Sequence, residues 1–329
     1  MALKPIDEIH ALQIQAGTLG RKAGHLFEDT ITQAINAFRY PYEVPPKITG
    51  NVFTGEPANL LLSYIGQDQG LKTIYHATAI STGALATSEA GKKWLSVNGA
   101  EISRCKSDLV LTLKAKDGKE TTIGVSTKQC NNKTPTNAQL YFTTARGFAN
   151  LLNNNGFQVS DKAILALRQF CGDVGFRPMD DNAKLNGRLV DPRRFFWEEI
   201  DSAGRKEWES IFTDHQDVVS RLLFQKAYLN DPFVPDYLLH KTKLAPSWEK
   251  TEVAIYSIEG LIEQSREYQG YATRPYSVKK GSHRDPPGVS HLAPRFGVIQ
   301  MQRGGQAQHP EQLQFNLEAS YFYKLASGK

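Results

Sequence analysis

Two runs of alternating residues, separated by a short polar turn, constrain the fold of this chain more than any other feature. Lys106 to Leu113 reads K-S-D-L-V-L-T-L, and Ile123 to Gln129 reads I-G-V-S-T-K-Q. Between them, Lys116-Asp117-Gly118 fits a three-residue hairpin loop, with glycine at the position that requires a positive φ. The two runs therefore predict the strands of an antiparallel β-hairpin.

The type of loop decides which side chains meet across this hairpin. A three-residue loop pairs Ala115 with Lys119, and the ladder then places Asp108 opposite Ser126. Because side chains alternate with period two, Lys128 emerges on the same face as Ser126. A two-residue turn would shift the register by one and separate Asp108 from Lys128. We therefore expect an acid and a lysine to converge if the loop has three residues.

An aspartate at the start of one strand, with a two-residue-spaced pair ending in lysine on its partner, resembles the PD-(D/E)XK nucleases, especially the type II restriction endonucleases. The resemblance covers three or four positions of the 329 residues. It implies an α/β (α+β) fold, with a mixed β-sheet core flanked by helices, and Mg²⁺ as cofactor. It also implies that Asp108 binds the metal and that Lys128 acts on the attacking water. A divalent cation held by carboxylates suits this reaction, because phosphodiester cleavage develops charge on an oxygen-rich centre.

The chain departs from the family pattern at Ser126, which stands where the family has Asp or Glu and which we expect to be a weak ligand or to hold water. No acid occurs between Lys128 and Asp161, so the missing carboxylate is expected upstream. Gly24 to Asn36 has apolar residues at helical spacing, with Glu28 in its first turns. A G-x-x-F-E helix recurs in the family, and the resemblance implies that Glu28 is catalytic and binds the metal. The alternative is an acid that merely favours the helix dipole.

Composition and charge limit the class of protein. The hydrophobic fraction of 40% and the charged fraction of 22% are typical of a globular protein. The sequence has no apolar segment long enough to cross a bilayer and no signal-peptide core at its start, so we expect a cytoplasmic protein without membrane association. Three widely spaced cysteines disfavour a disulfide framework or a zinc site. A net charge of +5 permits nucleic-acid binding without requiring it.

The pattern of residues changes near residue 190, and this change predicts the domain organisation. Residues 1–190 are expected to form the nuclease-like core, and residues 191–329 a helical bridge and a β-rich region for DNA recognition or dimerisation. One compact unit is the alternative. The expected helices are Ile6–Phe38, Glu56–Tyr64, Thr134–Asn153, Asp161–Cys171, Pro192–Ile200, Arg205–Leu229 and Glu259–Tyr268, and the expected strands outside the hairpin are Val253–Ile258, Phe296–Gly305 and Gln312–Glu318. The stretch from Thr78 to Ala90 is expected to be a loop with helical pieces.

Candidate DNA contacts come from three polar or basic segments. They are Gln129, Asn131, Asn132 and Lys133 after the hairpin, Arg274, Lys279, Lys280 and Arg284 in the most basic segment, and Gln302 and Arg303 near the C-terminus. Lysine and arginine neutralise phosphates, and amides offer both a donor and an acceptor to base edges. Each segment has an alternative interpretation. The first is then a solvated turn, the second an exposed loop, and the third a β-hairpin that contacts no DNA base.

Together these features predict a sequence-specific double-stranded DNA endonuclease of the type II restriction class. The resemblance implies products with 5′-phosphate and 3′-hydroxyl ends and a separately encoded companion DNA methyltransferase. A homodimer would supply one active site for each DNA strand. The missing acid at Ser126 leaves open a catalytically degenerate DNA-binding protein. A small-molecule hydrolase or transferase is disfavoured, because the sequence lacks G-x-S-x-G, P-loop, G-x-G-x-x-G and H-E-x-x-H motifs.

Overall fold

A computed structural model of the chain describes residues 8–46, 49–82, 96–97, 100–101, 105–185, 192–226, 231, 233–277, 290–303 and 311–319. The chain forms two compact units that interleave along the sequence. Unit 1 contains Met1–Gly20, Gln139–Leu223 and Ser265–Leu317, and unit 2 contains Arg21–Ala138, Phe224–Gln264 and Glu318–Lys329. Residue 190 lies inside the second segment of unit 1. A division of function at this residue stays a prediction.

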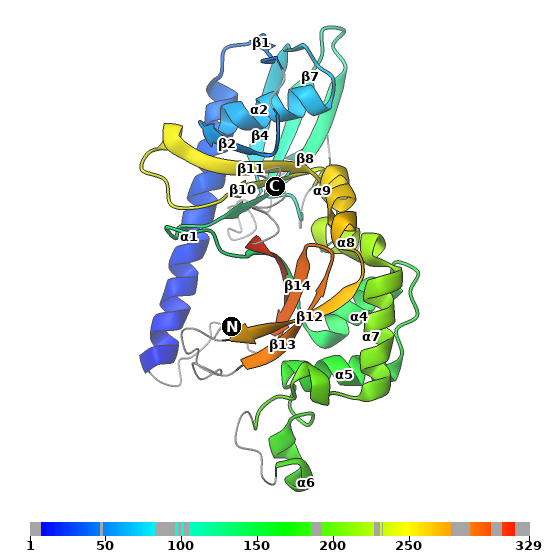
Figure 1. The fold of residues 1–329 in the computed structure, drawn as a ribbon. Coiled ribbons are helices and arrows are strands. Elements are labelled where there is room, and N and C mark those ends of the chain that lie inside the picture. The colour runs from blue at the N-terminus through cyan, green and yellow to red at the C-terminus, as the bar shows by residue number, and fades with distance from the viewer. Residues whose placement is uncertain are drawn as a thin grey trace. The chain divides into compact units, whose positions relative to one another are not determined.

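Unit 2 is built around a six-stranded mixed sheet (Figure 1). In the order in which they pair, its strands are β2 (Val52–Gly55), β11 (Thr251–Ser257), β10 (Tyr237–Lys241), β8 (Glu120–Gln129), β7 (Leu109–Lys114) and β4 (His76–Ser81). Strands β8 and β10 run parallel, and the other neighbouring pairs are antiparallel. A mixed sheet accompanied by helices confirms the expected α+β class.

The apolar core of unit 2 lies between one face of this sheet and two helices. Unit 2 also contains α2 (Pro57–Asp68), α9 (Ile258–Ser265) and the short pairs β1 (Tyr42–Glu43) with β3 (Thr73–Ile74) and β5 (Ser96–Val97) with β6 (Ala100–Glu101). Phe27, Ile31 and Ile35 form the buried stripe of α1 (Glu8–Ala37), as expected, and belong to one core cluster with Leu109 and Val125. Burying such side chains contributes about 1.5 to 3 kcal/mol each. This packing fixes the position of α1 relative to the hairpin strands.

The hairpin between β7 and β8 has the predicted three-residue loop. The Ala115 amide donates to the Lys119 carbonyl at 2.9 Å, and the Gly118 amide donates to the Ala115 carbonyl at 3.0 Å. Gly118 has a φ of 84°, in the left-handed region that favours glycine. The predicted register is therefore confirmed at the turn.

Replacing Gly118 with alanine should lower the free energy of unfolding by about 1 kcal/mol, because a Cβ is disfavoured at this φ. A Cβ built here meets no atom within 4 Å beyond its chain neighbours, so the cost is backbone strain. Gly118→Asn is the control and should lose less, since asparagine tolerates the left-handed region. Urea unfolding followed by circular dichroism measures both. An alanine variant as stable as the wild type would contradict the loop conformation.

Unit 1 contains a five-stranded sheet with helices packed against it. In pairing order its strands are β12 (Tyr271–Ser277), β13 (Ser290–Phe296), β14 (Ile299–Arg303), β15 (Leu313–Leu317) and β9 (Ala138–Thr143), and its helices are α4 (Ala145–Asn153), α5 (Asp161–Cys171), α6 (Asn182–Leu185), α7 (Ser202–Asp214) and α8 (Gln216–Gln225). Helix α5 ends as predicted, at Gly172 with a φ of 77°. Ser160 caps its start by accepting from the Ala163 amide.

Three expectations about local structure are wrong. Residues 138–143 form strand β9, and the helix expected from Thr134 begins only after its N-cap Thr144. Thr78 to Ser81 belongs to strand β4, whose small residues give little periodic signal. A helix over Pro192 to Ile200 is replaced by the 3₁₀ turn Trp197–Glu199. In the first two segments, pairing with a neighbouring strand overrides local propensity.

Candidate active site

The hairpin places Asp108 and Ser126 opposite each other, as the sequence predicted. Leu109 pairs with Val125, and the Asp108 amide donates to the Val125 carbonyl at 2.9 Å. The next step of the ladder joins position 108 to position 126. The Ser126 hydroxyl then donates to Asp108 Oδ2 at 3.0 Å. The register therefore brings the side chains together.

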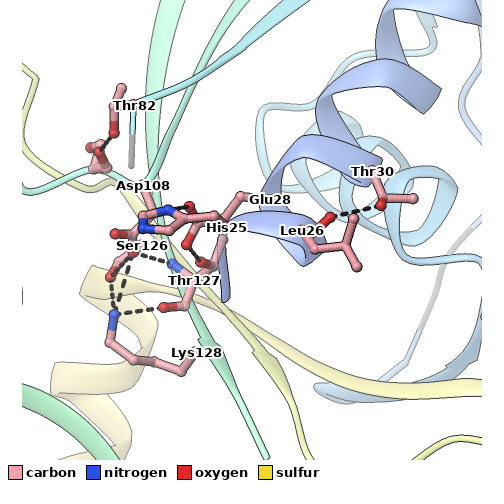
Figure 2. Close-up of polar contacts among 10 residues, drawn as sticks. His25, Leu26, Glu28, Thr30, Thr82, Asp108, Ser126, Thr127 and Lys128 are labelled. Carbon is pink, nitrogen blue, oxygen red and sulfur yellow. Dashed lines mark hydrogen bonds and ion pairs between the residues drawn. The ribbon is translucent and has the colours of Figure 1, made fainter. Parts of the chain in front are cut away.

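One oxygen of Asp108 collects three hydrogen bonds, which Figure 2 shows together. Oδ2 accepts from the Ser126 hydroxyl, from the Thr127 amide at 2.6 Å and from Lys128 Nζ at 3.3 Å. These donors fix the orientation of the carboxylate. Because all three bonds go to Oδ2, they leave Oδ1 as the oxygen that can face a cation.

Lys128 is held at its charged end by three oxygen atoms. Its Nζ donates to the Thr127 carbonyl at 2.6 Å and to the Ser126 hydroxyl at 2.8 Å, besides the bond to Asp108. The Lys128 side chain is 19% exposed and that of Asp108 is 29% exposed. Both groups are therefore ordered by the protein and still accessible to a bound substrate.

Glu28 reaches the same cluster from helix α1. Its Oε1 accepts from the Thr127 hydroxyl at 2.9 Å, and its Oε2 lies 3.5 Å from His25 Nδ1, without a hydrogen bond to any described residue (Figure 2). Burial, followed by repulsion from Asp108, raises the pKa of Glu28 to about 8. Glu28 and Asp108 are therefore brought close enough to repel, and the interpretation of Glu28 as only a solvated acid of the helix dipole is wrong.

The donor set suits a hard divalent cation such as Mg²⁺. Among the residues that the structure describes, no group of three or more His, Cys, Asp or Glu side chains could hold a metal ion. Two carboxylates, Glu28 and Asp108, with the Ser126 hydroxyl beside them, match a cation that binds few protein oxygens and keeps several waters. Burial is the main cause of the raised pKa of Glu28, and a cation would offset the second cause, the repulsion by Asp108. These residues therefore fit Mg²⁺.

Two further titratable residues adjoin Lys128 and were missed in the sequence. Desolvation and then the Lys128 charge lower the pKa of Lys106 to about 7, and Asp108 and Asp231 oppose this shift. His240 on β10 is the register partner of Lys128, and burial followed by the Lys128 charge lowers its pKa to about 3. Period-two alternation could have placed Lys106 on the Asp108 face. No local sequence pattern predicts that His240 lies beside Lys128.

The other predicted residues are distributed over both units. Gln129 ends β8 directly after Lys128, Asn131 accepts from Lys241 Nζ at 3.0 Å, and the Asn132 carbonyl accepts from the Leu244 amide. The predicted residues of unit 1 are Arg274 and Gln302, which are half-buried, and Arg303. Lys133 is exposed in unit 2, whereas Lys279, Lys280 and Arg284 lie outside the described residues.

Arg303, one of the predicted DNA contacts, is buried, and its contact with DNA stays a prediction. It is 5% exposed, and its guanidinium carbon lies 5.1 Å from the Phe196 ring centroid and 5.7 Å from that of Phe170. Such contacts are favourable cation–π interactions within a protein interior. The position of Arg303 therefore supports packing, whereas Gln302 points to the opposite face of β14.

Comparison with known proteins gives a limited result. No protein-family model matches the sequence, and no curated protein matches it. A crystal structure of the restriction endonuclease MspI in complex with its cognate DNA is similar, with 12% sequence identity and a TM-score of 0.42 over 79% of this chain and 78% of that chain. At this identity, residue roles do not transfer between the chains. Within the described part of the protein, no helix combines the length and apolarity needed to span a membrane.

The raised pKa of Glu28 makes the stability of the protein depend on pH. The ordinary value is 4.5 and the folded value is about 8. Between these values the folded state keeps a proton that the unfolded state has released, so stability falls as the pH rises. Above about pH 8, both states are ionised and the full loss is present.

Replacing Glu28 with glutamine should remove this pH dependence. In buffer with a chelator, the variant should differ little from the wild type near pH 4.5 and become increasingly more stable up to about pH 8. Thermal unfolding at several pH values measures the difference. Gln33→Ala, at an exposed and uncharged residue of the same helix, is the control and should keep the pH dependence of the wild type. A difference that stays constant across this range would contradict the raised pKa.

Proposed function

We propose that this protein is a Mg²⁺-dependent type II restriction endonuclease that cuts double-stranded DNA at specific sequences. The observation that carries the proposal is the convergence of Glu28, Asp108 and Lys128 in unit 2, with the lysine held by three oxygen atoms. Two carboxylates and one ordered ammonium group are suited to metal-assisted hydrolysis of a phosphodiester. The order of these residues along the chain, an acidic helix followed by the two hairpin strands, matches the PD-(D/E)XK nucleases that the sequence resembles.

Each residue has a separate task in this proposal. Asp108 and Glu28 would hold the metal, and Ser126 would be a weak ligand or would hold water. When bound, Mg²⁺ supplies positive charge that stabilises the oxygen-rich transition state. Lys128 Nζ has three donors, all engaged before substrate arrives, so it gives up its longest contact, 3.3 Å to Asp108, to orient the attacking water. Its charge also stabilises the negative charge that develops on the scissile phosphate. Its three contacts keep it in place before substrate arrives, which lowers the cost of ordering it during the reaction.

The proposed reaction is the hydrolysis of one phosphodiester bond in each DNA strand. The oxygen of one water forms a bond to phosphorus, the bond from phosphorus to the 3′ oxygen breaks, and a proton goes to that oxygen. The products carry 5′-phosphate and 3′-hydroxyl ends. Cutting both strands requires two active sites, so we propose a homodimer. A separately encoded DNA methyltransferase would protect the host sequence, without forming a stable complex with this cytoplasmic enzyme.

Ser126 favours one second candidate, a DNA-binding protein that has lost its catalytic metal. A hydroxyl binds divalent cations more weakly than a carboxylate, so the site has one charged ligand fewer than the family pattern. Titration with Mg²⁺ separates the candidates. An active enzyme should gain thermal stability and cut DNA as the metal is added, whereas a degenerate one should do neither.

The direct test is digestion of unmethylated phage DNA by the purified protein. With Mg²⁺ the enzyme should give discrete bands, and with a chelator it should give none. Fragments that ligate to adaptors without prior phosphorylation carry 5′-phosphates. A smear would contradict sequence specificity, and intact DNA at every Mg²⁺ concentration would contradict the nuclease assignment.

A further inference from the structure

The five-stranded sheet of unit 1 has one face made largely of amide side chains. Residues that pair directly across antiparallel strands share a face of the sheet. Arg295 pairs with Gln300, Gln300 pairs with Asn316, and Gln302 pairs with Gln314. The side-chain bond from Gln314 to Gln139 extends this face to β9. We call Gln139, Gln300, Gln302, Gln314 and Asn316 the amide face.

The opposite face of the same sheet packs against helices and forms the apolar core of unit 1. Phe296 stacks on Phe212 of α7 with a centroid distance of 4.4 Å, and Phe315 lies 4.6 Å from Phe148 of α4. Met301, between them on β14, is fully buried. The helices therefore cover the apolar face. The amides lie on the other face and are not part of this core.

Hydrogen bonds within the amide face fix the orientation of two central glutamines. Gln302 Nε2 donates to Gln300 Oε1 at 2.5 Å, and Gln302 Oε1 accepts from Asn316 Nδ2 at 3.3 Å. Gln314 Nε2 donates to Gln139 Oε1 at 2.5 Å. Gln300 and Asn316 are buried, whereas Gln302 and Gln314 are half-buried. The buried amides Gln300 and Asn316 thus orient Gln302, and Gln139, which is itself half-buried, orients Gln314.

Gln302 retains a defined pair of hydrogen-bonding groups. A primary amide has two N–H donors and an oxygen with two lone pairs. The bonds to Gln300 and Asn316 use one of each, which leaves one donor and one acceptor on an amide whose orientation is fixed. Adenine presents the complementary pair, an N7 acceptor and an N6 donor, in the major groove. Locking of the amide reduces the entropy lost on contact.

Charge and spacing favour DNA over an acidic or neutral protein surface as the partner. Arg274 pairs with Ala293, two residues from Arg295, so both arginines belong to the same face as the amides. In the described strands of this sheet, no acid occupies a position on that face. Directly paired side chains lie about 5 Å apart, which is between one and two steps of about 3.4 Å from base to base. Gln302 and Gln314 therefore suit the same or neighbouring base pairs.

We infer that Gln302 and Gln314 determine sequence specificity by reading base edges of double-stranded DNA, with adenine as the preferred partner of Gln302. Gln300, Asn316 and Gln139 position these two amides without reading bases themselves. This inference rests on the proposed function and adds to it the residues that select the sequence. It also adds a chemical prediction, because the cut or bound sequence should contain an A·T pair.

The test compares the sequence preference of Gln302→Ala with that of the wild type. Cleavage of a randomised DNA library, followed by sequencing of the ends, gives the preference at each position. The variant should lose about 5- to 150-fold discrimination at one A·T position and keep the others. Gln302→Glu lacks the amide donors and should shift the preference at that position from adenine toward cytosine. Gln158→Ala, an exposed amide of unit 1 outside the sheet, is the control.

The outcomes separate this inference from the proposed function. If the wild type does not cut, selection of bound duplexes from the same library tests the amide face alone, because base reading requires no cleavage. An unchanged preference in Gln302→Ala would overturn the inference. An equal loss on every sequence would also overturn it, since this pattern indicates a structural role. Matching circular dichroism spectra and melting temperatures confirm that each variant is folded.

Discussion

Replacing Lys128 with alanine is expected to lower the rate of DNA cleavage by about 10²- to 10⁴-fold, while binding to the same DNA persists. The reason is the position of Nζ, which donates to Asp108, Ser126 and the Thr127 carbonyl. These contacts hold a positive charge beside the carboxylate that we assign to the metal. Alanine removes this charge from the reacting centre, whereas it leaves the phosphate contacts elsewhere on the protein in place.

The remaining bonds should keep the site folded in this variant. Asp108 Oδ2 still accepts from the Ser126 hydroxyl and the Thr127 amide, so its carboxylate stays oriented. Lys128→Arg should also cut slowly, because a planar guanidinium cannot reproduce the three contacts of an ammonium group. Single-turnover cleavage and a mobility-shift assay measure rate and binding separately. Lys119→Ala, an exposed lysine of the same hairpin, is the control. Lys128→Ala that cuts at the wild-type rate would end the nuclease assignment.

The convergence of Asp108, Ser126 and Lys128 was predictable because it depends on local chemistry. Gly118 fixes the length of the loop, the loop fixes the register, and period two fixes the face. The same reasoning would have separated Gln302 from Arg303, since adjacent residues of a strand face opposite sides. The expectation that both contact DNA neglected this alternation, because the Arg303 guanidinium lies over the Phe196 and Phe170 rings on the other face. A contact of Arg303 with DNA stays a prediction.

Contacts between distant segments were not predictable from periodicity. Thr127 bonds to Glu28 across 99 positions of sequence, and only the family resemblance indicated that Glu28 would approach the hairpin. The parallel pairing of β8 with β10 places His240 beside Lys128, but neither strand carries a local signal for the other. Strand β9 was missed for the same reason, because its partner β15 lies far along the chain. Long-range pairing decides these elements.

Replacing Asp108 with asparagine should abolish stabilisation by Mg²⁺ and lower the cleavage rate by about 10³-fold or more, which corresponds to the several kcal/mol that a bound metal contributes. Asparagine has nearly the same shape and can still accept from the Ser126 hydroxyl and the Thr127 amide. What it lacks is the negative charge that attracts the cation and pairs with Lys128. Asp117→Asn in the exposed hairpin loop is the matched control, and thermal unfolding with and without Mg²⁺ measures the metal effect.

This variant also tests whether Asp108 and Glu28 share one site. Repulsion by Asp108 is the second cause, after burial, of the raised pKa of Glu28. In Asp108→Asn the pKa of Glu28 should therefore fall, and the pH range over which stability decreases should end at a lower pH. If that range is unchanged, the two carboxylates do not interact and cannot hold one cation. If the range shifts but cleavage persists, the carboxylates interact and the catalytic metal lies elsewhere, because loss of a ligand charge cannot leave a metal-dependent rate intact.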